Sequence, residues 1–256
     1  MNPYQQAVTD EEFNTNDGQI LGGVAIGIIL FGQAGYSFPP GSVENAQTFK
    51  YPVLFHGIHA ASVESVVSPK LDQDVISQLV DAGLYLEQQG CRAIIGACGY
   101  FANYLPQVVE KLHTPCFFSS LMQVPMILSS LRPKQKIGVL CANGKVLNSA
   151  PVLANCGIHD PSRLVVAGAE ELPEMKKILS GVGHYNTYKL EQGLIGLAKD
   201  LVTKNPDIGA FLLECTLFPS HAWAIQKEIK LPVFDFSTLI DWIHSAVVRK
   251  QFYGYM

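Results

Sequence analysis

The stretches GCRAIIGACG, residues 90–99, and GAFLLECT, residues 209–216, decide the fold of this chain. Each is an apolar run that is typical of a buried strand, and each contains a cysteine at the end of that run, Cys98 in the first and Cys215 in the second. A helical pattern follows each cysteine, so both thiols are expected at the carboxyl end of a strand. In open α/β sheets this edge is where ligands bind. The two stretches therefore predict a fold class and the place of a site.

The order of helix, tight turn, buried strand and cysteine occurs twice. Residues 71–89 and 190–202 carry apolar side chains at the helical period, and each precedes one of the cysteine strands. The sequence predicts further strands at 24–31, 52–56, 115–118, 136–141, 163–167 and 232–236, and further helices at 119–131, 145–155 and 237–248. This alternation predicts α/β architecture, with mainly parallel sheets and helices on both faces.

We expect two domains. Residues 1–18 show no sustained period and are predicted to form a flexible N-terminal arm. Residues 19–118 together with 236–256 are predicted to form the first α/β domain, which carries Cys98. Residues 119–235 are predicted to form the second, which carries Cys215. The terminal helix would then return to pack on the first domain.

The composition excludes several classes of protein. Hydrophobic residues make up 48% of the chain and charged residues 16%, which is enough apolar material for a large core. The net charge is -4 and Lys and Arg are scattered singly, so nucleic acid is not an expected partner. The most apolar stretch, residues 20–31, is too short to span a membrane, and acidic residues stand where a signal peptide would be basic. We expect a cytoplasmic protein with free thiols.

Paired thiols are suited to moving a proton from one face of a carbon atom to the other. The unperturbed pKa of a thiol, about 8.5, is close enough to neutrality for one cysteine to be a thiolate while its partner is protonated. Gly99, Tyr100 and Thr216 follow the two cysteines, and their backbone amides and hydroxyls could bind a carboxylate. The alternative is that Cys98 and Cys215 are ordinary core cysteines, as we expect for the others.

The two cysteine stretches, with Pro219 after the second, resemble the signature regions of the aspartate/glutamate racemase superfamily. Weaker similarity runs through most of the chain, at residues 26–30, 40–41, 119–120, 138–143 and 231–235. The resemblance implies a cofactor-independent racemase. It also implies two pseudo-symmetric three-layer α/β/α domains with the active site in the cleft between them.

The resemblance assigns roles to individual residues. Cys98 and Cys215 match the paired catalytic cysteines that flank the substrate α-carbon. Ser119, Asn143 and Thr216 match strand-end residues that hold the polar groups of the substrate. Lys145 falls near a binding position, where it would pair with a substrate carboxylate; the other interpretation is an exposed lysine at a helix start.

The chain departs from the family pattern at two positions. Members that act on acidic amino acids usually have Asn and Thr after the first cysteine, where this chain has Gly99 and Tyr100. Glu214 stands where a glycine usually precedes the second cysteine. A charge beside Cys215 would raise the pKa of its thiol, unless alternation along the strand turns Glu214 away.

We expect neither a metal nor a cofactor. His56 and His59 are predicted to lie on opposite faces of a strand, and no cysteine or carboxylate cluster completes a zinc set. His221 follows Cys215 on the next helix and either orients a thiol or substrate or has a capping role. No phosphate-loop or dinucleotide fingerprint is complete.

The resulting hypothesis is a racemase or epimerase of a small carboxylate substrate, such as aspartate or glutamate, with Cys98 and Cys215 as the two bases. Three alternatives remain open: a decarboxylase that needs one cysteine, a cis-trans isomerase of a small dicarboxylate, and a non-catalytic protein that binds a small acid in the same cleft. The expected partner is a small-molecule carboxylate. A second copy of the chain, in a homodimer, is the one protein partner considered.

Overall fold

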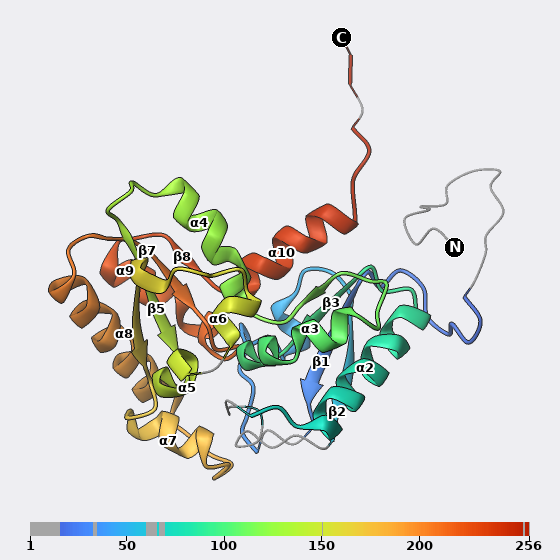
Figure 1. The fold of residues 1–256 in the computed structure, drawn as a ribbon, viewed down its shortest axis with the longest axis horizontal. Coiled ribbons are helices and arrows are strands. Elements are labelled where there is room, and N and C mark those ends of the chain that lie inside the picture. The colour runs from blue at the N-terminus through green and yellow to red at the C-terminus, as the bar shows by residue number, and fades with distance from the viewer. Residues whose placement is uncertain are drawn as a thin grey trace.

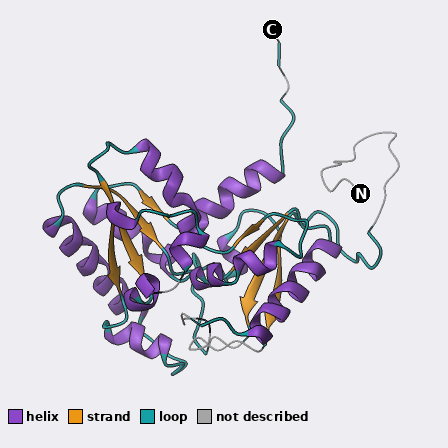
Figure 2. Ribbon diagram, viewed as in Figure 1, coloured by secondary structure: helices purple, strands orange, loops and turns teal. Residues whose placement is uncertain are grey.

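Two four-stranded parallel sheets, one in each half of the chain, form the centre of the structure (Figures 1 and 2). The computed structural model describes residues 16–32, 35–59, 66, 70–149, 151–252 and 254–255. Residues 1–15, which are most of the predicted N-terminal arm, lie outside the described residues.

The first sheet has the strand order β2-β1-β3-β4. Its strands are β1 (Ile26–Phe31), β2 (Val53–Ile58), β3 (Ala93–Gly96) and β4 (Cys116–Phe117). The helices of this half are α2 (Gln73–Gln88), α3 (Leu105–Val109) and, from the far end of the chain, α10 (Phe236–Val247).

The second sheet has the order β6-β5-β7-β8. Its strands are β5 (Lys136–Cys141), β6 (Leu164–Gly168), β7 (Ile208–Leu213) and β8 (Val233–Phe234). The helices of this half are α4 (Val124–Ser130), α5 (Gly144–Ser149), α6 (Val152–Asn155), α7 (Pro173–Leu179), α8 (Thr187–Lys204) and α9 (Ala222–Ile229).

The two sheets have the same topology. In each, the first strand of the half lies between the second and the third, as β1 lies between β2 and β3 and β5 lies between β6 and β7. Because the connections leave such a first strand in opposite directions, a crevice forms at its carboxyl end, and ligands bind there in parallel sheets of this kind. The predicted fold class, two α/β domains with parallel sheets, is confirmed.

Local sequence explains where the predicted elements begin and end. The Asp72 carboxylate caps α2 by accepting the backbone N–H of Asp74, and Gly90 follows the helix with φ of 85°. The strand predicted at 136–141 coincides with β5. The apolar run before Cys215 coincides with β7, so the second cysteine stretch is placed as predicted.

Two predicted helices differ from the structure. The helix predicted at 145–155 is divided into α5 and α6, and Pro151 stands between them because proline cannot donate the helical hydrogen bond. The helix predicted at 119–131 begins as a 3-10 helix, Ser120–Gln123, and continues as α4 from Val124. Both segments lie where the chain turns tightly past the other half.

Helix α10 packs on the first sheet although it follows the last strand of the second (Figure 1). Phe236, Leu239 and Ile240 share a buried core with Ile26 and Ile95 of β1 and β3. The chain therefore passes between the two halves twice, before the 3-10 helix at Ser120–Gln123 and again between β8 and α10.

Gln123 joins these two passages. Its Nε2 donates to the carbonyl oxygens of Ser120 at 3.2 Å and of Asp235 at 2.9 Å, and its Oε1 accepts from the Thr238 hydroxyl at 2.9 Å. Asp235 and Thr238 form the capping box that starts α10. Because Gln123 is buried, its loss leaves these partners without water to replace it.

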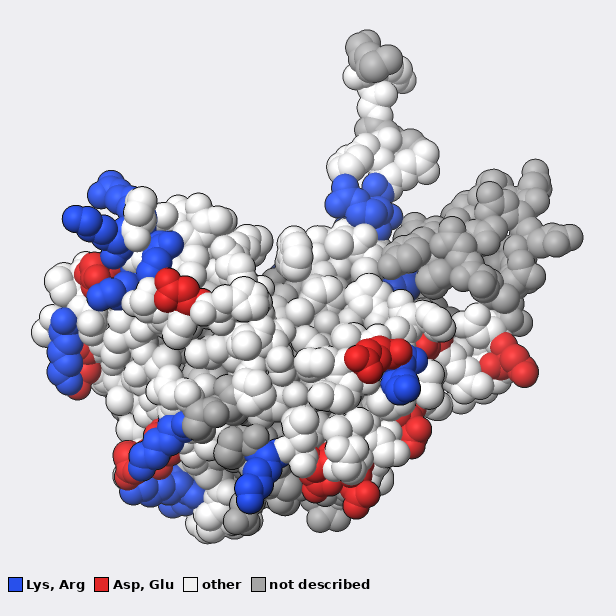
Figure 3. Space-filling view, viewed as in Figure 1, with Lys and Arg blue, Asp and Glu red and all other residues white. Residues whose placement is uncertain are grey.

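The surface carries dispersed charge. On the face shown in Figure 3, Lys and Arg alternate with Asp and Glu around the outer parts, and the middle of the face carries few charges. Within the described part of the chain, no helix has both the length and the hydropathy that a membrane span requires.

Replacing Gln123 by leucine is expected to lower the free energy of unfolding by about 2 kcal/mol, because a buried amide is removed and its partners lose their hydrogen bonds. Urea denaturation followed by circular dichroism measures the change. Gln226→Leu is the matched control: Gln226 is exposed on α9, so its replacement is expected to change stability by less than about 0.5 kcal/mol. Equal unfolding midpoints for the two variants would contradict a joining role for Gln123.

Candidate active site

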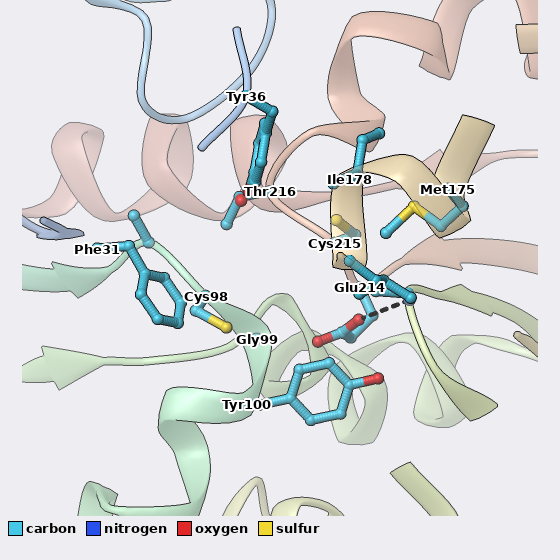
Figure 4. Close-up of a pocket in the computed structure, with 13 residues that line it drawn as sticks. Phe31, Tyr36, Cys98, Gly99, Tyr100, Met175, Ile178, Glu214, Cys215 and Thr216 are labelled. Atoms are coloured by element: carbon cyan, nitrogen blue, oxygen red, sulfur yellow. Dashed lines mark hydrogen bonds between the residues drawn. The ribbon is translucent and has the colours of Figure 1, made fainter. Parts of the chain in front are cut away.

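A cavity lies at the carboxyl ends of both sheets, between the two halves of the chain (Figure 4). Its walls come from the ends of β1, β3, β5 and β7 and from α7. The lining residues are Phe31, Tyr36, Ala97, Cys98, Gly99, Tyr100, Ala142, Met175, Ile178, Leu179, Glu214, Cys215 and Thr216. The free space is about 40 Å³, enough for roughly three water molecules. A site with this little free space suits a small ligand.

Cys98 and Cys215 occupy equivalent places in the two halves. Cys98 follows β3 and precedes a 3-10 helix, Gly99–Asn103. Cys215 follows β7 and precedes another 3-10 helix, Phe218–His221. Both are partly exposed to the cavity, whereas the other cysteines are buried in the core. The two thiols therefore line one cavity from opposite sheets.

The surroundings keep both thiols protonated. Burial raises the pKa of Cys98 and of Cys215 above the ordinary value, and the nearby Glu214 carboxylate raises both further. Backbone N–H groups of Tyr100 and Phe101 act in the opposite direction on the pKa of Cys98. They do not reverse the shift, so a thiolate at this site needs a positive charge close by.

Glu214 lies on the floor of the cavity. It is 0% exposed, and its Oε2 accepts the backbone N–H of Ala142 at 3.3 Å, the dashed line in Figure 4. Its Oε1 lies against the α-carbon of Gly99, so close that a Cβ at position 99 would overlap it. Alternation along the strand does not turn Glu214 away from the site. Gly99 and Glu214, the two departures from the family pattern, are in contact.

Glu44 is a second acid near the two thiols, although it is not among the residues that line the cavity. Its Oε1 accepts the Thr216 hydroxyl at 2.5 Å, and the Val43 N–H donates to the Thr216 carbonyl at 3.1 Å, so two bonds join this loop to the second half. Its buried Oε2 has no hydrogen-bond partner among the described residues. Burial raises the pKa of Glu44 to about 7, although the Thr216 hydroxyl opposes the shift. Glu44 in turn contributes to the raised pKa of Cys98 and Cys215.

The rest of the cavity is aromatic and apolar. Phe31 and Tyr36 lie on the first-half side, and Met175 and Ile178 of α7 lie on the second-half side (Figure 4). Burial raises the pKa of Tyr36, and Glu44 raises it further, so its hydroxyl stays neutral. Among the lining residues of the described chain there is no Lys, Arg or His. The described lining therefore offers no cationic side chain to an anionic ligand, and its aromatic rings can contact a cationic one.

Two loops meet beside Tyr36. Gly35 approaches Gly181, which follows α7, and the Tyr185 hydroxyl donates to the Ser37 carbonyl at 3.0 Å. Cys215 and Glu44 contribute to the raised pKa of Tyr185, after burial, which places this side chain close to the site. These contacts join the two halves near the cavity.

The structure brings together Cys98, Gly99, Tyr100, Cys215 and Thr216 of the predicted site residues. The Tyr100 hydroxyl is already engaged, because it donates to the Asn143 carbonyl at 2.7 Å and accepts the Asn143 N–H at 3.0 Å.

Ser119 and Asn143 do not line the cavity. The Ser119 hydroxyl accepts the Leu121 N–H at 3.3 Å, and the Asn143 side chain accepts the N–H groups of Lys145 and Val146, both at 3.1 Å. Both side chains therefore cap helix starts.

Lys145 and His221 also lie outside the cavity lining. Lys145 is exposed at the start of α5, in agreement with its alternative interpretation. His221 is buried, and its Nδ1 lies 3.2 Å from Glu191 Oε2. The described residues include no group of three or more His, Cys, Asp or Glu side chains that could hold a metal ion.

Sequence reasoning missed Glu44, Tyr36 and the α7 side chains. Glu44 lies just after the Pro40-Gly41 loop that the resemblance includes, but no motif marks it. One signal was available, since Glu44 is the single charged residue between positions 35 and 49. A lone charge in an apolar loop is a candidate for a buried functional group.

No family model matches the chain. Among curated proteins it is similar to dimethylsulfoniopropionate lyase 3 of Emiliania huxleyi, with 28% identity over 228 residues, and to lyase 6 of the same organism, with 29% identity over 228 residues. Each match covers 86% of this chain and 59% of the relative, so the chain spans well under two thirds of their length. A dimethylsulfoniopropionate lyase from Durusdinium sp. clade D is 26% identical over 219 residues, which cover 84% of this chain and 72% of the relative.

Solved structures share the fold at low sequence identity. Unliganded arylmalonate decarboxylase has a TM-score of 0.53 at 17% identity, over 88% of this chain and 92% of that one. Glutamate racemase from Campylobacter jejuni has a TM-score of 0.55 at 17% identity, over 90% and 88%. Aspartate racemase from Picrophilus torridus has a TM-score of 0.54 at 14% identity, over 88% and 94%. The chain therefore has the fold of the aspartate/glutamate racemase superfamily, as its two cysteine stretches predicted.

Proposed function

We propose that this protein is a carbon–sulfur lyase that acts on dimethylsulfoniopropionate or a closely related onium carboxylate. Its similarity to dimethylsulfoniopropionate lyases supports this proposal. The observation that carries it is the set of groups at the cavity. Glu214 and the two thiols line a small space with no basic side chain among its described lining residues, and Glu44 is hydrogen-bonded to Thr216 of that lining.

The substrate suits such a cavity because it carries a sulfonium cation at one end and a carboxylate at the other. In the proposed reaction a thiolate of the Cys98 and Cys215 pair takes a proton from the carbon beside the carboxylate. The electron pair of that C–H bond forms a C=C bond, and the C–S bond breaks with its electron pair remaining on sulfur. The products are dimethyl sulfide and acrylate. The proton is held on the cysteine thiol and then passes to solvent.

The cation has two partners in the site. The unpaired Oε2 of Glu44 is a ready counter-charge for the sulfonium group, and the rings of Tyr36 and Phe31 can contact its methyl groups. A bound cation also offsets the effects that raise the pKa of both thiols, so substrate binding favours formation of the thiolate. The base would thus form when its substrate is present.

An acidic amino acid suits the site less well. Aspartate and glutamate carry two carboxylates, and neither would find a cationic side chain among the described lining residues. Racemisation also requires a proton to be returned to the opposite face, whereas elimination requires only its removal. We therefore favour elimination over the racemase hypothesis drawn from the sequence. Elimination is closer to the decarboxylase alternative, which also needs one cysteine.

Cys98→Ala and Cys215→Ala identify the base: loss of the cysteine that supplies the thiolate is expected to lower kcat for dimethyl sulfide release by at least about 100-fold, the scale of a lost base, and loss of the other by less. Gas chromatography of the headspace measures dimethyl sulfide, and proton NMR measures acrylate. Cys91→Ala is the matched control, because Cys91 is buried in the core after α2 and lies outside the cavity lining.

Running the same reaction in deuterium oxide separates the lyase from a racemase. A lyase forms acrylate, while a racemase given L- or D-glutamate exchanges the α-hydrogen without bond cleavage. Exchange of glutamate or aspartate without any cleavage of dimethylsulfoniopropionate would overturn the proposed function.

Glu44→Gln is expected to raise KM for dimethylsulfoniopropionate by about tenfold or more, because the buried counter-charge of the sulfonium group is removed. Inhibitors test the cause. β-Alanine betaine, which has a quaternary ammonium group, should inhibit the wild type better than its isostere 4,4-dimethylpentanoate, which has the same carboxylate but an uncharged tert-butyl group, and Glu44→Gln should narrow this difference.

Glu87→Gln is the control for that substitution, since Glu87 accepts the backbone N–H groups of His113 and Thr114 and does not line the cavity. Because the pKa of Glu44 is raised to about 7, its carboxylate is present above that pH, and binding of the betaine should strengthen as pH rises through 7. Equal inhibition by the betaine and by its tert-butyl isostere would contradict the role of Glu44.

A further inference from the structure

Glu214 is the one acid on the cavity floor that the proposed reaction has not yet used. Its Oε2 is engaged by the Ala142 N–H at 3.3 Å, and its buried Oε1 has no hydrogen-bond partner among the described residues. A buried oxygen without a donor is costly if it carries charge. The free oxygen lies beside the α-carbon of Gly99, next to Cys98 in the chain.

The groups that face Glu214 offer it no positive charge. They are Cys98 from the end of β3, Tyr100 from the following 3-10 helix, Cys141 from β5, Cys156 after α6, and the adjacent Cys215. All are neutral when protonated and repel a carboxylate when ionised. Burial raises the pKa of Glu214 to about 8, against the opposing effect of the Ala142 N–H.

We propose that Glu214 is a catalytic residue that remains a neutral carboxylic acid and donates a hydrogen bond from Oε1 to the carboxylate of the substrate. This inference rests on the proposed elimination and identifies the group that stabilises its charge. As the proton beside the substrate carboxylate leaves for the thiolate, negative charge develops on the carboxylate oxygens. The Glu214 proton stays on Glu214, and its hydrogen bond strengthens as that charge grows.

The position of Glu214 fits this role better than that of a base. Its carboxyl occupies the space that a side chain at position 99 would fill, directly after Cys98. A substrate whose α-carbon lies between the two thiols would place its carboxylate near this group. Because Lys, Arg and His are lacking among the described lining residues, a neutral acid is a donor that the site itself supplies.

Glu214→Gln separates a donor from a base. Glutamine keeps an N–H donor in place of the acid and an oxygen for the Ala142 N–H, so kcat is expected to stay within about tenfold of wild type, while Glu214→Leu should lose about 100-fold or more. Thermal unfolding of both variants checks that each is folded. If Glu214→Gln is as inactive as Glu214→Leu while both are folded, Glu214 exchanges a proton and the proposal is overturned.

Binding of propionate tests the donor without catalysis. Isothermal titration calorimetry should show affinity in the wild type that weakens as pH rises through about 8, where Glu214 loses its proton. Glu214→Gln should lack this weakening, and Glu214→Leu should bind poorly throughout. Glu44, whose pKa is raised to about 7, faces the same site and is present in every variant, so the difference between variants isolates Glu214. Identical pH dependence in wild type and Glu214→Gln would overturn the proposal.

Difference infrared spectroscopy reads the protonation state directly. The wild type minus Glu214→Gln should contain a carboxylic acid C=O band at neutral pH. Glu174→Gln is the control, because Glu174 is paired with Lys177 and its loss should remove an ionised carboxylate band. A carboxylate band from Glu214 at neutral pH would refute the proposal. If the wild type fails to cleave dimethylsulfoniopropionate, the proposed function fails, and the propionate and infrared results still decide the state of Glu214.

Discussion

The contact between the Glu214 carboxyl group and the α-carbon of Gly99 is the constraint on which the site depends. Glu214 directly follows β7 of the second sheet and Gly99 follows β3 of the first, so the contact is made between the two sheet edges. Any side chain at position 99 would displace the carboxyl group. The two departures from the family pattern are therefore in contact, and the Glu214 carboxyl group occupies the space that a side chain at position 99 would fill.

This contact also sets the electrostatics of the cavity. Burial without a cation raises the pKa of Glu214, and a charge on Glu214 would raise the pKa of both thiols. Glu44 adds to the effect from the other side, while Thr216 fixes its position. The ionised forms of these acids and thiols are thus disfavoured in the empty cavity. A positively charged ligand would offset the free-energy cost of burying their charge.

Much of the fold could be predicted from the sequence because its signals are local. Apolar runs flanked by polar or turn-forming residues predicted β5 and β7, and Gly90 predicted the end of α2. Pro151 was a sequence signal for the division between α5 and α6, but the apolar periodicity on both sides of it favoured a single helix.

The site was harder to predict. Cys98 and Cys215 could be placed because each ends a strand, whereas Ser119 and Asn143, which also end strands, turn their side chains back to cap the next helix. Glu44 reaches the site only through tertiary packing, and carbon–sulfur cleavage could not be inferred without the charge it brings.

One fold can support racemisation and elimination because both begin with the same step, removal of a proton beside a carboxylate. The fate of the resulting carbanion depends on the leaving group and on how the site treats charge. A substrate with a sulfonium group two carbons from its carboxylate loses that group once the electron pair is released, so no second proton transfer is needed. In this cavity the same cation would also promote the thiolate that starts the reaction. Under the proposed function, selection of the substrate and activation of the base would both depend on one property, the burial of two acids near two thiols without a basic lining residue in the described chain.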